Sequence, residues 1–172
     1  MKSDKTKIYK RHYEDSKLIP VYAEEVFAFI DDHARLSSHM NKSSWMTGGG
    51  RMHTSVDAGH GQEIGSHIRM SGKAFGITLF LDEVVIYREP PYMKVWETVG
   101  EPKLLVVGHY RMQVKIEPRE EGSLLGVSID YDLPTMNIWL GKLFSGFYAK
   151  WCVQQMIKDV CNHLQHKKYY NL

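Results

Sequence analysis

Two glutamates occupy apolar positions in segments that alternate in the manner of β-strands. Glu83 has the parity of Leu81 and Val85, and Glu97 has the parity of the valines two positions to either side. Alternate residues of a strand share one face, so both carboxyl groups are predicted to face an apolar interior. Burial favours the protonated form of a carboxyl group, which suits it to general acid or base catalysis. A bulge would return either group to water, and Trp96 competes with Glu97 for the interior.

Two tyrosines are predicted to orient a ligand. Tyr110 and Tyr131 lie on the apolar faces of two neighbouring predicted strands. Their hydroxyl groups could bind a carbonyl or hydroxyl group, although a buried phenol also commonly has a structural partner, so both interpretations stay open. The candidate catalytic residues are Glu83, Glu97 and Tyr131. The candidate ligand-binding residues are Tyr110, Met112, Tyr131, Phe147, Trp151 and Trp96.

The histidines do not form a recognisable metal motif. His53, His60 and His67 recur every seven residues around a predicted turn, with only Asp57 and Glu63 as nearby carboxylates. No zinc-binding motif accompanies them, so histidines on strand faces are favoured over a metal site. We therefore predict no metal and no other cofactor.

Neither the glycine run nor the cysteines indicate a reactive loop. The three glycines at 48–50 are not followed by the Lys and Ser or Thr of a phosphate-binding loop, and they predict a flexible start to a strand. No GxSxG motif is present. Cys152 and Cys161 lie on one predicted helix, about 13 Å apart along its axis, which is too far for a disulfide. Free, inert thiols are typical of a reducing compartment.

The composition is that of a globular protein. The chain has 172 residues, 43% hydrophobic and 24% charged, which predicts one domain over 1–172 with a frayed start at 1–8. A net charge of +2 is too small to indicate nucleic-acid binding. The basic residues gather at the two termini, where weak contact with a membrane surface is the alternative to simple solvation. Because the sequence shows neither a signal peptide nor a membrane span, we expect a cytoplasmic protein. It does not indicate an oligomeric state.

The order of the elements predicts an α+β fold with an antiparallel sheet. The segment after 134 has helical spacing, whereas most of the preceding chain alternates with a period of two. The predicted strands are 9–20, 51–57, 65–72, 75–88, 92–99, 104–116 and 124–133, and the predicted helices are 23–33, 36–40 and 138–165.

Several local features occur in the order seen in one superfamily. An apolar strand end at 19–20 leads into a small residue, an acidic pair and Val26–Phe27, and a later strand starts at Gly65–Ser66. Residues 84–91 end in a double proline, and 117–123 form a polar hairpin. Trp45 aligns loosely with a tryptophan of some members. Over residues 15–165 the chain resembles the START-like or Bet v 1-like (SRPBCC) superfamily, of polyketide cyclase/dehydrase and lipid-transport type.

This resemblance implies a helix-grip fold, in which a curved antiparallel sheet wraps around a long C-terminal helix and two short helices follow the first strand. It also implies a deep apolar cavity between the sheet and that helix. We therefore expect the chain to bind a hydrophobic small molecule of lipid, polyketide, isoprenoid or quinone type. One alternative is an enzyme resembling a polyketide cyclase or dehydratase. Another is a protein-interaction or quinone-chaperone module, for which residues 36–45 would supply an exposed apolar patch.

Overall fold

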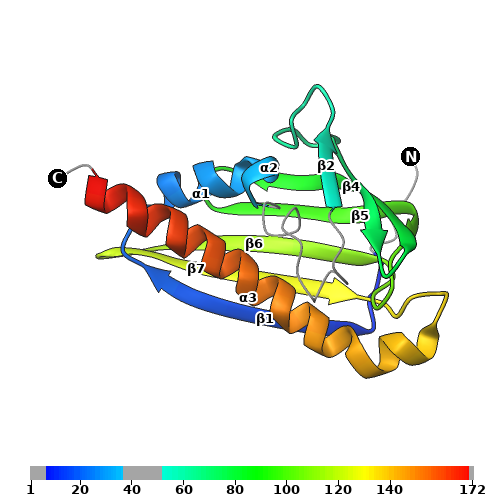
Figure 1. Ribbon diagram of the computed structural model, residues 1–172. Helices are drawn as coiled ribbons and strands as arrows, with labels where there is room; N and C mark the ends of the chain where they lie inside the picture. The colour runs from blue at the N-terminus through cyan, green and yellow to red at the C-terminus, as the bar shows by residue number, and fades with distance from the viewer. Residues whose placement is uncertain (1–6, 37–51, 171–172) are drawn as a thin grey trace.

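A curved seven-stranded antiparallel sheet packs against one long helix, α3 (Figure 1). The computed structural model describes residues 7–36 and 52–170, with side chains up to residue 164 except that of residue 34. The strands are β1 (Arg11–Ile19), β2 (Met52–Val56), β3 (His67–Ala74), β4 (Ile77–Glu89), β5 (Met93–Lys103), β6 (Tyr110–Arg119) and β7 (Gly122–Tyr131). The helices are α1 (Ala23–Asp31), α2 (His33–Leu36) and α3 (Ile138–Tyr170).

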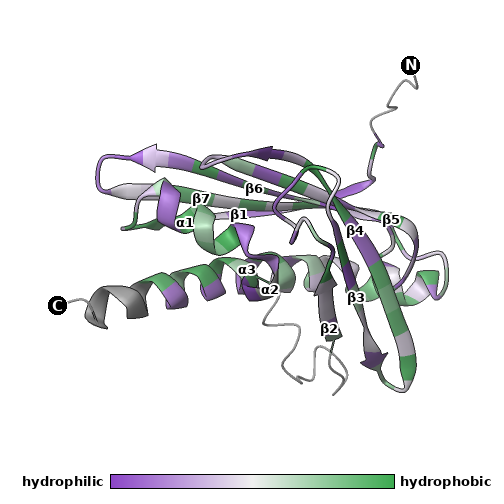
Figure 2. Cartoon of the chain, turned by 90° about the horizontal axis from the view of Figure 1, so that it is seen from above, coloured by the Kyte–Doolittle hydropathy of each residue, from purple (hydrophilic) through white to green (hydrophobic). Residues whose placement is uncertain are grey.

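The first two strands lie at opposite edges of the sheet, and the later strands fill the space between them. The strand order is β1-β7-β6-β5-β4-β3-β2, so β2 lies at the edge opposite to β1 and the later strands return one by one until β7 pairs with β1. Seen from above, the sheet and α3 form two layers, and the side of the sheet around β2 to β4 curls toward the level of α3 (Figure 2). The predicted α+β class and antiparallel sheet are confirmed.

The second half of α3 anchors the helix to the sheet. Its buried residues recur at helical spacing and belong to one apolar core with the inward faces of the strands. They are Ala149, Val153, Met156, Ile157, Val160, Cys161 and Leu164. The first half differs, because large apolar side chains from Ile138 to Phe147 are exposed. Burial of one helix face therefore holds α3 from its second half, while its first half stands over the other end of the sheet.

Residues 104–109 form a loop, although the sequence predicted a strand from 104 onward. Pairing with β7 begins only at Tyr110. The predicted turn at 100–102 is instead a bulge inside β5, where Gly100 has a φ of 65° and the register with β4 shifts. As a result β5 continues to Lys103, and the chain then folds across the end of the sheet as an apolar loop.

The predicted strand over 75–88 starts two residues later, at Ile77. Phe75 and Gly76 have φ values of 49° and 75° and form the two-residue turn of the β3–β4 hairpin. The predicted parity holds in the middle of β4, where Leu81, Glu83 and Val85 are buried. Tyr87 is exposed, because the register shifts between Val85 and Tyr87.

Most of the predicted second helix over 36–40 lies outside the described residues. The structure has a single helical turn, α2, which starts earlier, at His33. Residues 37–51 lie outside the described residues, and with them Trp45, the glycines at 48–50 and most of the proposed apolar patch at 36–45.

Candidate functional site

A large apolar cavity lies between the start of α3, the end of the β3–β4 hairpin and the 104–107 loop. Its volume is about 880 Å³. The wall is made mostly of aliphatic and aromatic side chains, with Lys73 and Asn137 among the few polar ones. Its other lining residues include Met52, Phe75, Ile77, Leu79, Leu104, Leu105, Val106, Val107, Trp139, Leu140, Phe144, Phe147 and Tyr148. A cavity of this size and character suits an apolar small molecule.

A second, much smaller hollow of about 40 Å³ lies next to the large cavity. Leu104, Val107 and Tyr148 line both spaces, so they form the partition between them. The small hollow is walled by α2, the inward faces of β3 to β7 and the middle of α3, and it contains the polar group Glu83. Its volume is enough for about one water molecule or one small functional group.

Glu83 is the centre of a buried polar cluster in this hollow. The residue is 1% exposed. Its Oε1 accepts hydrogen bonds from Trp96 Nε1, at 3.1 Å, and from the Tyr110 hydroxyl group. A carboxyl group taken out of water needs such donors, because an unpaired buried charge is strongly unfavourable. The three residues come from β4, β5 and β6, so the curvature of the sheet brings them together.

The other oxygen of Glu83 is less well satisfied. Oε2 accepts no hydrogen bond from the described residues, and His33 Nε2 lies 3.4 Å from it. His33 is buried beside Trp96, and the two rings meet edge to face with centroids 5.1 Å apart. Oε2 is therefore a buried acceptor with capacity for a further donor, in the hollow that Tyr148 separates from the large cavity.

The tyrosines at the site keep their protons at ordinary pH. Burial and the neighbouring Glu83 carboxyl group raise the pKa of Tyr110. Burial, with smaller effects of Cys152 and Glu83, also raises the pKa of Tyr148. Both phenols are thus hydrogen-bond donors rather than bases at neutral pH.

The structure distributes the predicted ligand-binding residues among different places. Tyr110, Met112 and Trp96 line the small hollow, and Phe147 lines the large cavity. Other predicted residues line neither space. Tyr131 is buried in the core close to Gly146 of α3, and Trp151 is half-buried with its ring centroid 5.9 Å from that of Tyr148.

The structure places Glu97 away from both spaces. Trp96 occupies the inward position, and Glu97 points to the opposite face of β5. There Glu97 Oε2 accepts a hydrogen bond from Arg111 Nη2 at 2.7 Å, and the Tyr9 hydroxyl group lies 3.5 Å away. The expectation that Glu97 shares an apolar interior face fails because Lys94, Trp96 and Thr98, not the odd-numbered residues, point inward at this part of β5.

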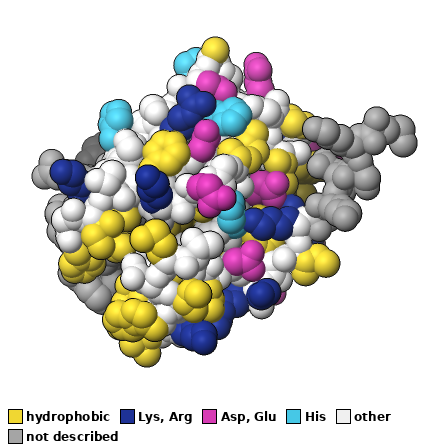
Figure 3. Space-filling view, turned by 90° about the vertical axis from the view of Figure 1, so that its right-hand side faces the viewer, with side chains coloured by type: hydrophobic (Ala, Val, Ile, Leu, Met, Phe, Trp, Pro, Cys, Tyr) yellow, Lys and Arg dark blue, Asp and Glu magenta, His cyan; other side chains and the backbone are white. Residues whose placement is uncertain are grey.

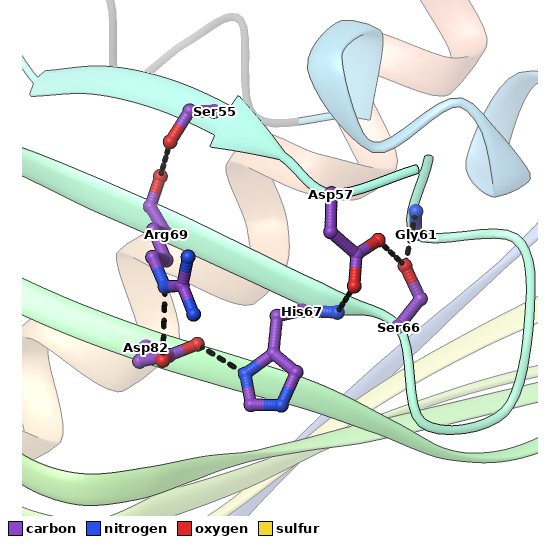
Figure 4. A network of polar contacts seen from close by, with 7 residues as sticks. All are labelled: Ser55, Asp57, Gly61, Ser66, His67, Arg69 and Asp82. Carbon is purple, nitrogen blue, oxygen red and sulfur yellow. Dashed lines mark hydrogen bonds and ion pairs between the residues drawn. The ribbon is translucent and has the colours of Figure 1, made fainter. Parts of the chain in front are cut away.

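Among the three histidines around the β2–β3 loop, His67 takes part in structural contacts. His67 Nδ1 lies 2.8 Å from Asp82 Oδ1, and Arg69 Nε donates to the other Asp82 oxygen (Figure 4). Asp57 accepts hydrogen bonds from Ser66 Oγ and the His67 backbone, which close the loop. Within the described part of the chain, no three His, Cys, Asp or Glu side chains are placed to hold a metal ion.

A second buried ionic cluster lies under α1, and no sequence pattern predicted it. Lys94 is fully buried, and its Nζ lies 3.1 Å from both Oδ1 and the backbone oxygen of Asp31. Arg88 binds the same carboxylate through two nitrogens, at 3.0 and 2.7 Å. Burial lowers the pKa of Lys94. Burial acts to raise the pKa of Asp31, but hydrogen bonds from Arg88 and the charge of Lys94 outweigh it and lower that pKa.

Other residues of the site also escape prediction from the sequence. His33 ends the predicted first helix, and no local pattern indicates which way it points. Tyr148 belongs to the amphipathic pattern of α3 and carries no sign that it separates two spaces. The 104–107 loop resembles a strand in sequence because all four residues are aliphatic and Leu104 and Val106 have the parity of Tyr110 and Met112.

Sequence and structure comparisons place the chain among known proteins. The family described as polyketide cyclase / dehydrase and lipid transport matches residues 10–167. No curated protein matches the chain. Norcoclaurine synthase from Thalictrum flavum, in complex with dopamine and hydroxybenzaldehyde, is similar in structure with a TM-score of 0.65. It has 10% identity over 91% of this chain and 87% of that one.

Two further structures show the same likeness. TTHA0849 from Thermus thermophilus has a TM-score of 0.64 and 15% identity, covering 91% of this chain and 99% of that one. Ara h 8.0201 has a TM-score of 0.60 and 13% identity, covering 91% and 98%. At these identities the structural likeness supports the helix-grip type of fold and says nothing of a ligand.

Proposed function

Since this chain belongs to the polyketide cyclase / dehydrase and lipid transport family, we propose that it binds an apolar small molecule in the cavity under the start of α3. The observation that carries the proposal is that two spaces of different character lie next to each other. A wide apolar cavity of about 880 Å³ shares the wall residues Leu104, Val107 and Tyr148 with a hollow that contains a buried carboxyl group.

The large cavity would supply most of the affinity. Apolar surface removed from water contributes about 25 cal/mol per Å², and the lining offers few polar groups that would lose hydration. A lipid, polyketide, isoprenoid or quinone would each satisfy this wall. Phe147 and Leu140 would contact the ligand from α3, and Leu79 would contact it from β4.

Glu83 would orient the ligand. Because Oε2 is buried and accepts no hydrogen bond from the described residues, a ligand group that donates a hydrogen bond would be favoured there. A hydroxyl, ammonium or amide group at the leading end of an otherwise apolar molecule fits this requirement. Rotation of Tyr148 or Leu104 would open the partition between the cavity and Glu83.

A second candidate function, cyclisation, is favoured by the same unfilled acceptor. As a carboxylate, Glu83 could take a proton from a carbon next to a ligand carbonyl group. The enolate so formed would attack a second carbonyl group of the same molecule, and the proton would return to the new alkoxide. Under this function Glu83→Gln would still bind the molecule but would not convert it.

The binding proposal is tested by filling the cavity. Leu79→Trp adds bulk to the wall, and the exposed Ile64→Trp is the matched control because Ile64 lies in the β2–β3 loop, outside both spaces. Each protein is titrated with cis-parinaric acid, and binding is followed by the probe's fluorescence. We expect Leu79→Trp to weaken binding by at least about tenfold, because the loss of roughly 60 Å² of apolar contact corresponds to one decade in Kd. Equal affinity in all three folded proteins would refute the proposal.

A further inference from the structure

The mouth of the large cavity is surrounded by exposed apolar side chains from separate segments. The β3–β4 hairpin turn contributes Phe75, which is 70% exposed. The start of α3 and the residues before it contribute Met136, Trp139 and Leu143, the last of which is 65% exposed. The side of the molecule that carries these elements shows hydrophobic side chains in clusters, with Lys, Arg, Asp and Glu side chains between them (Figure 3). We call these four residues, together with Lys103 and Lys142, the mouth surface.

Phe75 lies at the hairpin turn, where it both lines the large cavity and stays mostly exposed. It has a φ of 49°, in the left-handed region that bulky residues rarely adopt, and the following Gly76 completes the turn. The turn and the adjoining end of β4 are hydrophobic, whereas the end of β3 includes a hydrophilic stretch (Figure 2). A large aromatic ring at an exposed turn is unfavourable in water, and smaller polar residues form such turns more readily. This choice of residue therefore indicates that the ring has a use outside the fold.

Lysines outnumber carboxylates in the segments around the mouth, where Glu101 and Asp132 flank the apolar stretches. The hairpin segment 71–81 contains Lys73 and no acidic residue, and residues 102–109 contain Lys103 and no acidic residue. From 133 to 150 the chain contains Lys142 and Lys150 and again no Asp or Glu. Exposed aromatic and aliphatic side chains interspersed with an excess of lysines are typical of surfaces that lie on anionic membranes.

We propose that the mouth surface docks on an anionic phospholipid bilayer. Phe75, Trp139 and Leu143 enter the interface between headgroups and acyl chains, where aromatic rings are favoured, and Lys103 and Lys142 contact the phosphate groups. The docked cavity faces the bilayer, so an apolar ligand passes between membrane and cavity without crossing water. None of the helices among the described residues is long and apolar enough to span a membrane, so the contact is peripheral.

A second copy of this chain fits the mouth surface less well. In a two-fold symmetric dimer the same patch meets itself, so Lys103 and Lys142 would approach lysines of the other copy. Glu101 and Asp132, which flank these segments, are fewer than the lysines that they would have to pair with. Like charges brought together at an interface are unfavourable, whereas a layer of anionic headgroups is complementary to this pattern.

The test measures binding to vesicles of phosphatidylcholine alone and of phosphatidylcholine with phosphatidylserine, by co-sedimentation. The test variants are Leu143→Glu and Lys142→Glu, because neither residue lines the cavity. The control for the first is Ile64→Glu, since Ile64 is 66% exposed and lies ~26 Å from the hairpin turn, at the other end of β3. The control for the second is Lys158→Glu, ~24 Å further along α3.

We expect the unchanged protein to bind the anionic vesicles, to bind phosphatidylcholine alone much less, and to lose binding as salt is added. Leu143→Glu and Lys142→Glu should each weaken binding by about tenfold or more, while both controls bind like the unchanged protein. Binding of cis-parinaric acid in solution should stay the same in Lys142→Glu, which separates failure of docking from failure of the ligand proposal.

Three results would overturn the inference. Absence of binding to either kind of vesicle would do so, as would equal binding by the test variants and their controls. The third result would be a dimer, detected by analytical ultracentrifugation, that the Leu143→Glu substitution dissociates. The mouth surface would then be an interface between two copies of the chain.

Discussion

Tyr110 and Glu83 lie on β6 and β4, two strands that are not neighbours, yet the Tyr110 hydroxyl group donates a hydrogen bond to Glu83 Oε1. The intervening β5 supplies Trp96, whose Nε1 donates to the same oxygen. The contact spans β5 because all three side chains point into the concave face. The hydrogen bonds link β4, β5 and β6 through one buried polar cluster next to the apolar cavity. The binding proposal depends on this arrangement.

The Glu83 carboxyl group should discriminate between ligands that can and cannot donate a hydrogen bond. Glu83→Gln should weaken binding of a long-chain alcohol by about tenfold, since a buried hydrogen-bond donor left without its acceptor costs roughly 1–3 kcal/mol. Binding of the corresponding methyl ether should change little. Displacement of cis-parinaric acid measures both affinities.

Glu97→Gln is the control for this experiment, because Glu97 carries the same charge on the opposite face of β5 and lines neither space. Equal losses for the alcohol and the ether, or equal effects of the two substitutions, would contradict the role given to Glu83.

The ionic cluster under α1 should be important for stability. Asp31→Asn removes the carboxylate that pairs with the fully buried Lys94 and with Arg88. We expect the free energy of unfolding, measured by urea denaturation, to fall by about 3–5 kcal/mol, because a buried charge loses its partner. Adding Lys94→Met to this variant should recover part of the loss. A destabilisation below about 1 kcal/mol, or no recovery, would show that Lys94 is adequately solvated.

The same cluster should make stability depend on pH in the acid range. The pKa of Asp31 is lower in the folded protein than its ordinary value of 3.8, so between the two values the unfolded chain binds a proton that the folded chain does not. The contribution of Asp31 to stability is therefore complete when the pH is above the ordinary pKa. It is lost as the pH falls through the pKa of the folded protein. Unfolding measured between pH 6 and the acid limit, roughly pH 2, should show a smaller decline in Asp31→Asn. An identical decline in both proteins would contradict this.

Gly141 should be needed for the close approach of α3 to the loop beneath it. A Cβ atom at this position would collide with the Pro134 ring and come within 3.2 Å of the Val106 backbone oxygen. Gly141→Ala should therefore destabilise the fold by about 1–3 kcal/mol in thermal unfolding. Gly146→Ala is the matched control, since its nearest neighbour would be the Tyr131 hydroxyl oxygen at 3.9 Å.

Helix propensity alone should make the control variant slightly more stable, by roughly 0.5–1 kcal/mol. If both substitutions stabilised the protein, the packing of α3 against residues 106 and 134 would be looser than the structure shows.

The sequence predicted an element correctly where the spacing of its apolar residues matches the period of the strand or helix that they form. The alternation from Tyr110 to Ile116 and the helical spacing from Ile138 onward predicted β6 and α3, because one face of each is buried in the same core. It also identified Glu83, whose burial follows from the parity of Leu81 and Val85. Such periodicity indicates directly which face of a helix or strand is buried.

The remaining features depend on backbone details and on distant contacts. The prediction failed at Glu97, because Trp96 takes the inward position and the face shared by Val95, Glu97 and Val99 is the outer one. The prediction of a strand also failed at 104–107, where the apolar residues belong to a loop that lines the cavity. His33 and Lys94 are buried by groups from distant parts of the chain, and local sequence does not encode such pairs.

Native mass spectrometry of the protein purified from its own host, beside Leu79→Trp prepared in the same way, tests the binding proposal most directly. A denaturing extraction then identifies any released molecule. We predict that the unchanged protein carries one apolar molecule per chain and that Leu79→Trp carries little or none, because the added indole ring occupies the cavity. An empty unchanged protein, or equal amounts of the same molecule on both, would contradict the proposal.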